Sequence, residues 1–247
     1  MLVFFSYYMK KKVVFIQDSN YLQFLAKFGV GGAHPGGINL SKEILKNESI
    51  LPTSHILDVG CGTGQTAAFL ASYYTTNVTG IDINPIMIEK ARHRMKKARL
   101  PVNIIQGSIE ETSLPNGAFD FVLAESVLSF VHKQRALQEI FRLLKQGGRL
   151  IAIEFTIPTL LSSQLADDIQ QFYGFDALFT KKDWVALFQE IGFQDIRIQK
   201  NKDISSKPEF HISKEIESTL YDVLDQHIMM NEKYDNILDY RIYICTK

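Results

Sequence analysis

Residues 55–64 read HILDVGCGTG, and this stretch decides the fold class. The short apolar run at 55–59 is typical of a buried strand, and the GxGxG pattern after it predicts a turn into a helix beginning near Gln65. Glycines let the backbone amides of such a helix start approach a ligand closely, because no Cβ intervenes. A dinucleotide-binding fingerprint would need a further glycine at position 65. The spacing therefore argues against nicotinamide and suits a ligand that carries an amino-acid moiety beside a nucleoside.

Downstream of this turn, short apolar runs alternate with segments of helical periodicity, which is typical of βαβ units in a parallel sheet. Strands are predicted at 55–59, 77–82, 102–106, 119–124, 149–155, 193–200 and 240–246. Between them, Asn84 is a predicted N-cap with Pro85 as the first helical residue, and Thr180 with Asp183 resembles a capping box. The pattern predicts an α/β protein.

Asp82 ends the second predicted strand, after the glycine loop. A carboxylate there is positioned to accept hydrogen bonds from the two hydroxyls of a ribose at the carboxyl edge of the sheet. These residues predict nucleoside binding but not the chemistry that goes with it.

With these two motifs in place, the chain resembles the class I S-adenosylmethionine-dependent methyltransferases. The matching segments are 56–64 for their first motif, GIDINP at 80–85 for their second, and then 107–115, FDFVLAES at 119–126 and LKQGGR at 144–149. The resemblance implies S-adenosyl-L-methionine as the cofactor. It also implies a doubly wound, Rossmann-like α/β fold with a seven-stranded, mainly parallel sheet whose last strand is reversed.

The resemblance implies roles for individual residues near the cofactor. Those expected to hold its methionine end are Asp58, Gly60, Cys61, Gly62 and Gly64. Asp82 would bind the ribose, and Ile83 would pack on the adenine. Many family members place an acidic residue at the position of Ser108 to meet the adenine amino group; here Ser108, Ile109 and Glu110 are alternatives for that contact.

Two residues are candidate bases. Glu125 ends the fourth predicted strand, where the resemblance places residues facing the transferred methyl; its carboxylate could take a proton, or it could only hydrogen-bond the cofactor or a loop amide. His34 lies in GGAHPGG at 31–37, which looks like a loop shared by a subset of small-molecule methyltransferases. A histidine there could act as a base near neutral pH, although a capped turn would also explain the loop.

The expected activity is methyl transfer to a small molecule by in-line displacement, in which the enzyme mainly contributes proximity and alignment. Whether O, N, S or C is methylated stays open. Two alternatives stay open as well: a non-catalytic S-adenosylmethionine- or nucleoside-binding module, and an NAD-dependent oxidoreductase on the same layer architecture.

One domain is expected over the whole chain. Its predicted parts are a possible N-terminal arm at 1–17, cap helices at 18–48, a cofactor-binding core at 50–155 and helical lid insertions at 156–192 and 201–233. The cap helices are predicted to end at Gly29 and to start again at Ser41, and 212–230 shows helical spacing. The apolar residues 1–9 are interpreted as an upstream extension, with Met9 as an alternative initiator, because they are too short to span a bilayer.

Aromatic residues gather in the two regions expected to cover the pocket: Tyr21, Phe24, Phe172, Tyr173 and Phe175. They could line an apolar acceptor site, but for most of them packing of the lid onto the core is the favoured interpretation. The basic run from Arg92 to Arg99 is interpreted as the solvated face of a helix.

The net charge of the chain bears on which classes of partner it could bind. Lys+Arg (27) and Asp+Glu (27) cancel, so nothing favours a nucleic acid or an anionic membrane. The two cysteines, Cys61 and Cys245, form no CxxC pair, so neither a disulfide framework nor a metal site is expected. The small number of cysteines favours a cytoplasmic location. The oligomeric state, monomer or homodimer, stays open.

Overall fold

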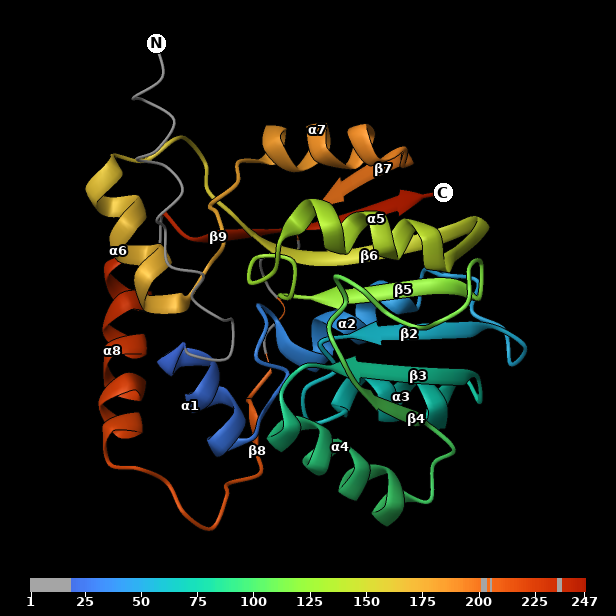
Figure 1. Cartoon of the computed structure of the whole chain (residues 1–247), viewed down its shortest axis with the longest axis horizontal. Helices are drawn as coiled ribbons and strands as arrows, with labels where there is room; N and C mark the ends of the chain where they lie inside the picture. The colour runs from blue at the N-terminus through green and yellow to red at the C-terminus, as the bar shows by residue number, and fades with distance from the viewer. Residues whose placement is uncertain (1–18, 201–203, 205, 235–236) are drawn as a thin grey trace, which may run out of the picture.

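The computed structural model describes residues 19–200, 204, 206–234 and 237–247 (Figure 1). The predicted arm at 1–17 and the alternative start at Met9 lie outside the described residues.

A seven-stranded sheet forms the centre of the fold, in the order β4-β3-β2-β5-β6-β9-β7. Its strands are β2 (His55–Val59), β3 (Asn77–Asp82), β4 (Asn103–Gln106), β5 (Phe119–Glu125), β6 (Leu144–Thr156), β7 (Gln194–Gln199) and β9 (Asp239–Thr246). The pairs among β2 to β6 are parallel, whereas β9 runs antiparallel to both β6 and β7. The predicted mainly parallel α/β sheet with a reversed last strand is confirmed.

Helices cover both faces of the sheet (Figure 1). One face carries α2 (Gly37–Leu45), α3 (Gln65–Tyr73) and α4 (Pro85–Ala98), and the other carries α5 (Lys133–Leu143) and α7 (Lys181–Ile191). Successive residues of β2 serve opposite faces: Ile56 packs with the first group of helices, and Leu57 with the second. Because both faces of the sheet are covered at its centre, β2 and β5 are buried along most of their length, whereas the edge strand β7 has only exposed and half-buried residues.

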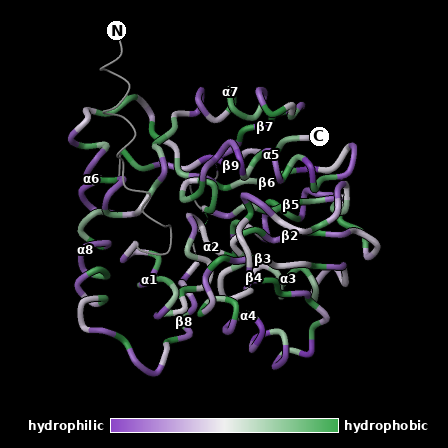
Figure 2. The backbone as a smooth tube through the Cα atoms, viewed as in Figure 1, coloured by the Kyte–Doolittle hydropathy of each residue, from purple (hydrophilic) through white to green (hydrophobic). Residues whose placement is uncertain are grey.

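The hydropathy of the chain follows this arrangement. Figure 2 shows apolar residues along the central strands and alternating apolar and hydrophilic residues along the helices, as expected for helices with one buried side. None of the described helices has the length and apolar character needed to cross a bilayer.

Local capping confirms two predictions and corrects a third. Asn84 Oδ1 accepts the backbone N–H groups of Ile86 and Met87 at the start of α4, at 2.9 and 3.3 Å. Thr180 forms the predicted capping box at the start of α7. The predicted cap at Ser41 is wrong, because α2 begins at Gly37, after Gly36 in the left-handed conformation.

A third group of helices stands at the carboxyl ends of the parallel strands (Figure 1). We call α1 (Asn20–Phe28), α6 (Ser163–Tyr173) and α8 (Thr219–Lys233) the lid. Its apolar side chains form a cluster of their own, together with Phe130 and Phe175 from neighbouring loops.

Two segments predicted to belong to the lid differ in detail from the structure. Within 156–192, α6 belongs to the lid, whereas α7 packs on the sheet through Trp184 and Phe188. The helix predicted over 212–230 begins only at Thr219.

A small second sheet, absent from the prediction, pairs β1 (Val30–Gly31) with β8 (Glu209–Phe210). It ties the segment ahead of α2 to the segment ahead of α8. Arg94 of α4 supports it by donating to Glu209 at 2.8 Å and to the Thr63 carbonyl at 2.8 Å. The basic helix face is therefore only partly solvated.

The capping box gives a direct test of local stability. Thr180→Ala should lower the free energy of unfolding by about 1 kcal/mol, because the N–H of Asp183 loses its acceptor. Urea denaturation measures the change. Ser162→Ala, at the start of α6, is the matched control, since this residue makes no capping hydrogen bond and its loss should be much smaller. Equal losses in the two variants would contradict the capping account.

Candidate functional site

A cavity that is partly open to solvent lies at the carboxyl ends of β2, β3 and β5. The candidate residues that line it are His34, Asp58, Gly60, Cys61, Gly62, Asp82, Ile83, Ser108, Ile109 and Glu125. Gly64 does not: it starts α3 and faces α4, where an added Cβ would lie 2.7 Å from Met95. Glu110 is also elsewhere, accepting the backbone N–H of His132 at 3.0 Å. The fold thus brings together most of the residues proposed from sequence.

The glycine loop, residues 60–64, needs its glycines for different reasons. Gly60 and Gly62 have φ values of 61° and 52°, in the left-handed region that favours glycine. A Cβ on Gly60 would lie 2.4 Å from Val127, so the loop could not pack against the segment after β5. A Cβ on Gly62 would meet nothing nearer than 4.0 Å, so the backbone there stays open toward the cavity.

Asp82 joins the glycine loop to the start of α4. One carboxylate oxygen accepts the N–H of Gly62 at 2.9 Å, and the other accepts the N–H of Asn84 at 2.8 Å. Burial raises the pKa of Asp82, while these backbone N–H groups act in the opposite direction. Each oxygen keeps a second lone pair that can accept from a ligand hydroxyl.

Asp58 carries a buried carboxylate that lacks a full set of partners. The residue is 2% exposed, and its Oδ2 has no hydrogen-bond partner among the described residues. Burial raises the pKa of Asp58 well above its usual value, and the carboxylates of Glu125 and Asp82 raise it further. No Lys or Arg is among the described residues that line the cavity. A ligand with a positively charged group therefore fits this end of the cavity.

His34 and Glu125 meet inside the cavity, although they come from the loop before α2 and from the end of β5. Nε2 of His34 lies 3.5 Å from Oε2 of Glu125, and their side chains are only 4% and 12% exposed. The same carboxylate oxygen accepts the hydroxyl of Thr66 at 2.7 Å. The hydroxyl of Ser41 lies 3.3 Å from Nε2 of His34.

The surroundings of His34 fix its tautomer. Nδ1 lies 3.1 Å from the carbonyl oxygen of Pro35, which can only accept, so Nδ1 carries a proton. In the neutral ring, Nε2 is then the nitrogen without a proton, and it faces the Ser41 hydroxyl and the Glu125 carboxylate.

Glu154 is a functional residue that we did not predict. It is fully buried at the end of β6. Its carboxylate accepts the backbone N–H groups of Val127, Leu128 and Ser129 and the hydroxyl of Ser129, at 2.8 to 3.1 Å. It thereby holds the loop after β5, which lines the cavity. The sequence signal is a carboxylate inside the otherwise apolar run at 150–155.

Cys61 is the one predicted cofactor residue with a reactive side chain in the glycine loop. Its thiol is buried, and burial raises its pKa well above the usual value. It therefore stays protonated and serves packing rather than nucleophilic attack. Among the described residues, no cluster of His, Cys, Asp or Glu is arranged to hold a metal ion.

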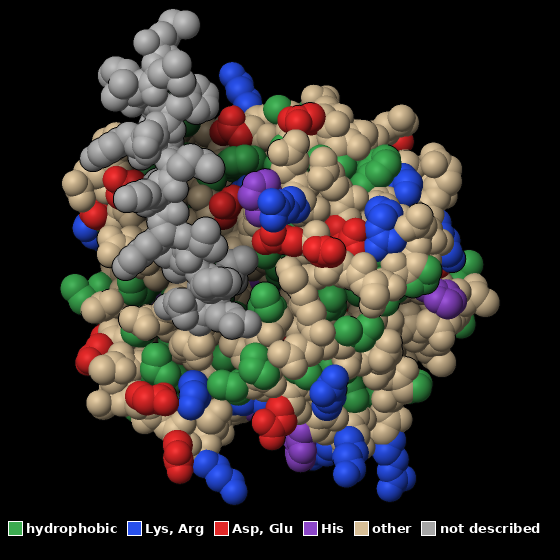
Figure 3. Space-filling model, viewed as in Figure 1, with side chains coloured by type: hydrophobic (Ala, Val, Ile, Leu, Met, Phe, Trp, Pro, Cys, Tyr) green, Lys and Arg blue, Asp and Glu red, His purple; other side chains and the backbone are tan. Residues whose placement is uncertain are grey.

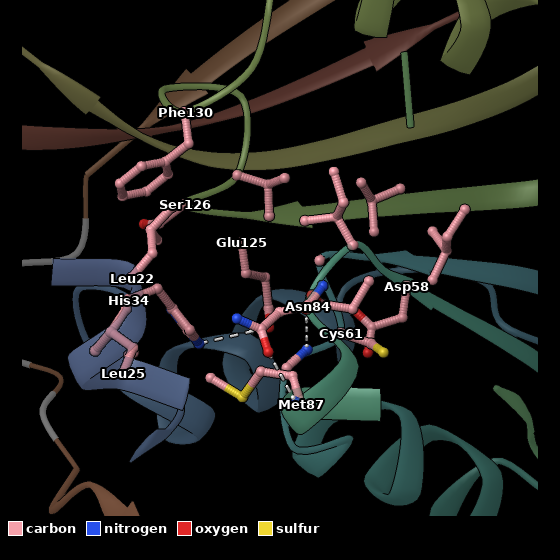
Figure 4. A pocket seen from close by; sticks show the side chains of 18 of the residues that line it. Leu22, Leu25, His34, Asp58, Cys61, Asn84, Met87, Glu125, Ser126 and Phe130 are labelled. Atoms are coloured by element: carbon pink, nitrogen blue, oxygen red, sulfur yellow. Dashed lines mark hydrogen bonds and ion pairs between the residues drawn. The ribbon is translucent and has the colours of Figure 1, made fainter. Parts of the chain in front are cut away.

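The far end of the cavity is apolar. Of the five lid aromatics singled out from sequence, only Tyr21 lines the cavity, and the others pack inside the lid cluster. Leu22, Leu25, Phe130 and Phe155 line this end and were not predicted. Figure 4 shows Leu22, Leu25 and Phe130 on one side of Glu125, with Asp58, Cys61 and Asn84 on the other.

Comparison with known proteins places this site in a family. The family described as "Methyltransferase domain" matches residues 57–152, from β2 to β6. The "Uncharacterized methyltransferase YodH" of Bacillus subtilis is 36% identical over 233 residues, which are 93% of this chain and 100% of that protein. The "2-methyl-6-phytyl-1,4-hydroquinone methyltransferase 1, chloroplastic" of Oryza sativa subsp. japonica is 35% identical over 147 residues, 59% of this chain and 42% of that protein. This chain thus spans less than half of the rice enzyme.

A solved structure shares the fold over nearly the whole chain. Phosphoethanolamine N-methyltransferase 2 of Haemonchus contortus, in complex with phosphomonomethylethanolamine and S-adenosylhomocysteine, superposes with a TM-score of 0.76. The identity is 20%, and the match covers 94% of this chain and 58% of that one. At this identity the likeness concerns the fold.

Asp82→Ala tests the ribose contact. The affinity for S-adenosylhomocysteine should fall about tenfold to hundredfold, because charge-assisted hydrogen bonds are lost, and calorimetry measures this. Asp120→Ala is the matched control: this carboxylate at the other end of β5 pairs with Lys145 and does not line the cavity. Unchanged affinity in Asp82→Ala would remove the residue from the site.

The buried carboxyl group of Glu154 should make the free energy of unfolding depend on pH. Burial raises its pKa to about 7, although the donors around it act against the rise. Between the pKa of an unfolded glutamate and about 7, the folded state holds a proton that the unfolded state has lost, so this stabilising contribution declines as the pH rises. Glu154 should therefore make the protein about 3 kcal/mol less stable at pH 8 than at pH 5.

Urea denaturation of Glu154→Gln at pH 5 and pH 8 measures this effect. The difference in the free energy of unfolding between the two pH values should be smaller than in the unchanged protein. Glu139→Gln is the control: Arg142 lowers the pKa of Glu139 to about 2, so its contribution is present above the unfolded pKa and is lost only at more acidic pH. The account fails if the two variants keep the same difference between pH 5 and pH 8.

Proposed function

The chain belongs to the class I S-adenosylmethionine-dependent methyltransferases, and we propose that it methylates a small molecule by in-line displacement, with His34 and Glu125 as a proton-accepting pair. The observation that carries this proposal is the 3.5 Å contact between His34 Nε2 and Glu125 Oε2 inside the cavity. Membership of this family leaves the NAD-dependent oxidoreductase without support.

The residues present fit the cofactor of the family. Bound S-adenosylmethionine supplies an electrophilic methyl group on a positively charged sulfur. Asp58 would accept from the ammonium group of the methionine end, since its Oδ2 is buried without a partner among the described residues. Asp82 would accept from the ribose hydroxyls.

The adenine would lie at the side of the cavity lined by Ile83 and Ile109. Ser108 lines the same side and stays the candidate for the adenine amino group. Its hydroxyl accepts the N–H of Glu110 at 3.2 Å and keeps a second lone pair. Glu110 is a poorer candidate, because its carboxylate is directed to His132.

Methyl transfer to a hydroxyl requires that the acceptor lose a proton as the new bond forms. His34 Nε2 would take that proton, and the resulting imidazolium would pair with Glu125. Thr66 and Ser41 would keep the two side chains in place through their hydroxyls. Alignment of the acceptor with the methyl group supplies most of the remaining acceleration.

The names of the relatives suggest two different acceptor classes. The worm structure contains phosphomonomethylethanolamine, a phosphorylated amine. The rice enzyme is named for a phytyl hydroquinone, which has an apolar body and hydroxyl groups. The acidic lining of the cavity supports a non-anionic acceptor for this chain.

Variants of His34 and Glu125 test the proposed proton-accepting role. The acceptor is first chosen as the best of a panel of phenols, thiols and amines, by formation of S-adenosylhomocysteine. His34→Ala should then lower kcat by about 10²–10⁴, since general-base catalysis is lost, and Glu125→Gln should lower it less. The affinity for S-adenosylmethionine should change little in His34→Ala.

His93→Ala is the matched control, because this histidine is exposed on α4 and does not line the cavity. Full turnover in His34→Ala would rule out the base. No turnover with any acceptor, despite cofactor binding, would favour the non-catalytic binding module.

A further inference from the structure

The cavity has two ends of different chemistry, with Glu125 and His34 between them (Figure 4). Acidic side chains line one end, and apolar side chains of α1 with Phe130 and Phe155 line the other. The polar end, with Asp58 and Asp82, matches the cofactor. The apolar end then remains for the methyl acceptor.

The apolar end is lined by a packed aromatic ring and by two partly exposed leucines. Tyr21 is held by Tyr173, whose ring lies edge-on at 4.9 Å, and by Phe130, whose ring lies nearly parallel at 6.4 Å. Leu22 and Leu25 of α1 are only half-buried and line the cavity beside it. Such a surface gains free energy by covering an apolar ligand.

Charge excludes one class of acceptor. Among the described residues, the cavity presents three carboxylates and neither Lys nor Arg. Two basic side chains of α4 are held by other partners. Arg94 donates to the Thr63 carbonyl and to Glu209, and Lys90 donates to the Lys27 carbonyl and to Ser213. A phosphate or carboxylate in the apolar end would be buried without a countercharge and near like charges, which is unfavourable.

We propose that the methyl acceptor is a non-anionic molecule with an apolar body and a group that loses a proton on methylation. Its body lies against Leu22, Leu25 and Phe130, and the group to be methylated lies toward His34. This assignment rests on the proposed function, because it takes His34 as the residue that receives the proton. It names the chemical class of the acceptor and excludes phosphorylated ones.

A matched pair of probes tests this class by binding alone. 1-Naphthol and 1-naphthyl phosphate share one ring system and differ in charge at neutral pH. Both are titrated into the full-length protein saturated with S-adenosylhomocysteine, and their fluorescence reports binding without turnover. 1-Naphthol should bind at least about tenfold more tightly than its phosphate.

A charge introduced at the apolar end should reverse this preference. Leu25→Lys places a cation against the ligand body, so the ratio of the two affinities should shift toward the phosphate by about tenfold or more. Leu160→Lys is the matched control, because Leu160 is 83% exposed and does not line the cavity, and it should leave the ratio unchanged.

Three results would overturn the proposal: equal or tighter binding of the phosphate to the unchanged protein, no binding of either probe, or the same ratio in Leu25→Lys as in Leu160→Lys. These outcomes are separate from those of the base variants. A failed base would leave the probe selectivity intact, and a failed selectivity would leave the loss of turnover in His34→Ala intact.

Discussion

Three carboxylates at one edge of the sheet are the constraint on which the site depends. Because β3, β2 and β5 are parallel neighbours, Asp82, Asp58 and Glu125 all reach the same cavity. Each carboxylate is held differently: Asp82 by two backbone N–H groups, Glu125 by a hydroxyl and an imidazole, and Asp58 with one oxygen left unpartnered among the described residues. Three neighbouring carboxylates repel one another, and a cationic ligand offsets this repulsion. It explains why the pocket suits a sulfonium cofactor and a non-anionic acceptor.

The rest of the fold holds this edge in place and closes it. Glu154 on β6 holds the loop after β5 by accepting its backbone N–H groups. The β1–β8 pair ties the segment ahead of α2 to the segment ahead of α8. Helix α1 of the lid supplies part of the apolar end of the cavity, and the lid has its own cluster of side chains. Figure 3 shows charged side chains spread over the visible face without a continuous basic stripe. The polar end of the cavity is thus built by the edge of the sheet, whereas the apolar end is built by α1 together with Phe130 and Phe155.

The strands could be predicted because their periodicity and the glycine turn are local signals. The predicted bounds of 55–59 and 77–82 agree with β2 and β3. The misses have physical reasons as well. Strands β1 and β8 have two residues each, too few to show a period, and Ser41 resembles a cap although Gly36 already starts the helix one turn earlier. The proximity of His34 to Glu125 depends on how the loop before α2 folds over the sheet edge, which no local pattern encodes. Both residues could be nominated from sequence, but their contact could not.

A crystal structure of the protein with S-adenosylhomocysteine bound tests the central claim most directly. The account predicts the ligand's ammonium group on Asp58, its ribose hydroxyls on Asp82 and its sulfur facing the space between His34 and the apolar end. A ligand whose amino-acid end lies away from Asp58, or whose sulfur faces away from His34 and Glu125, would contradict it.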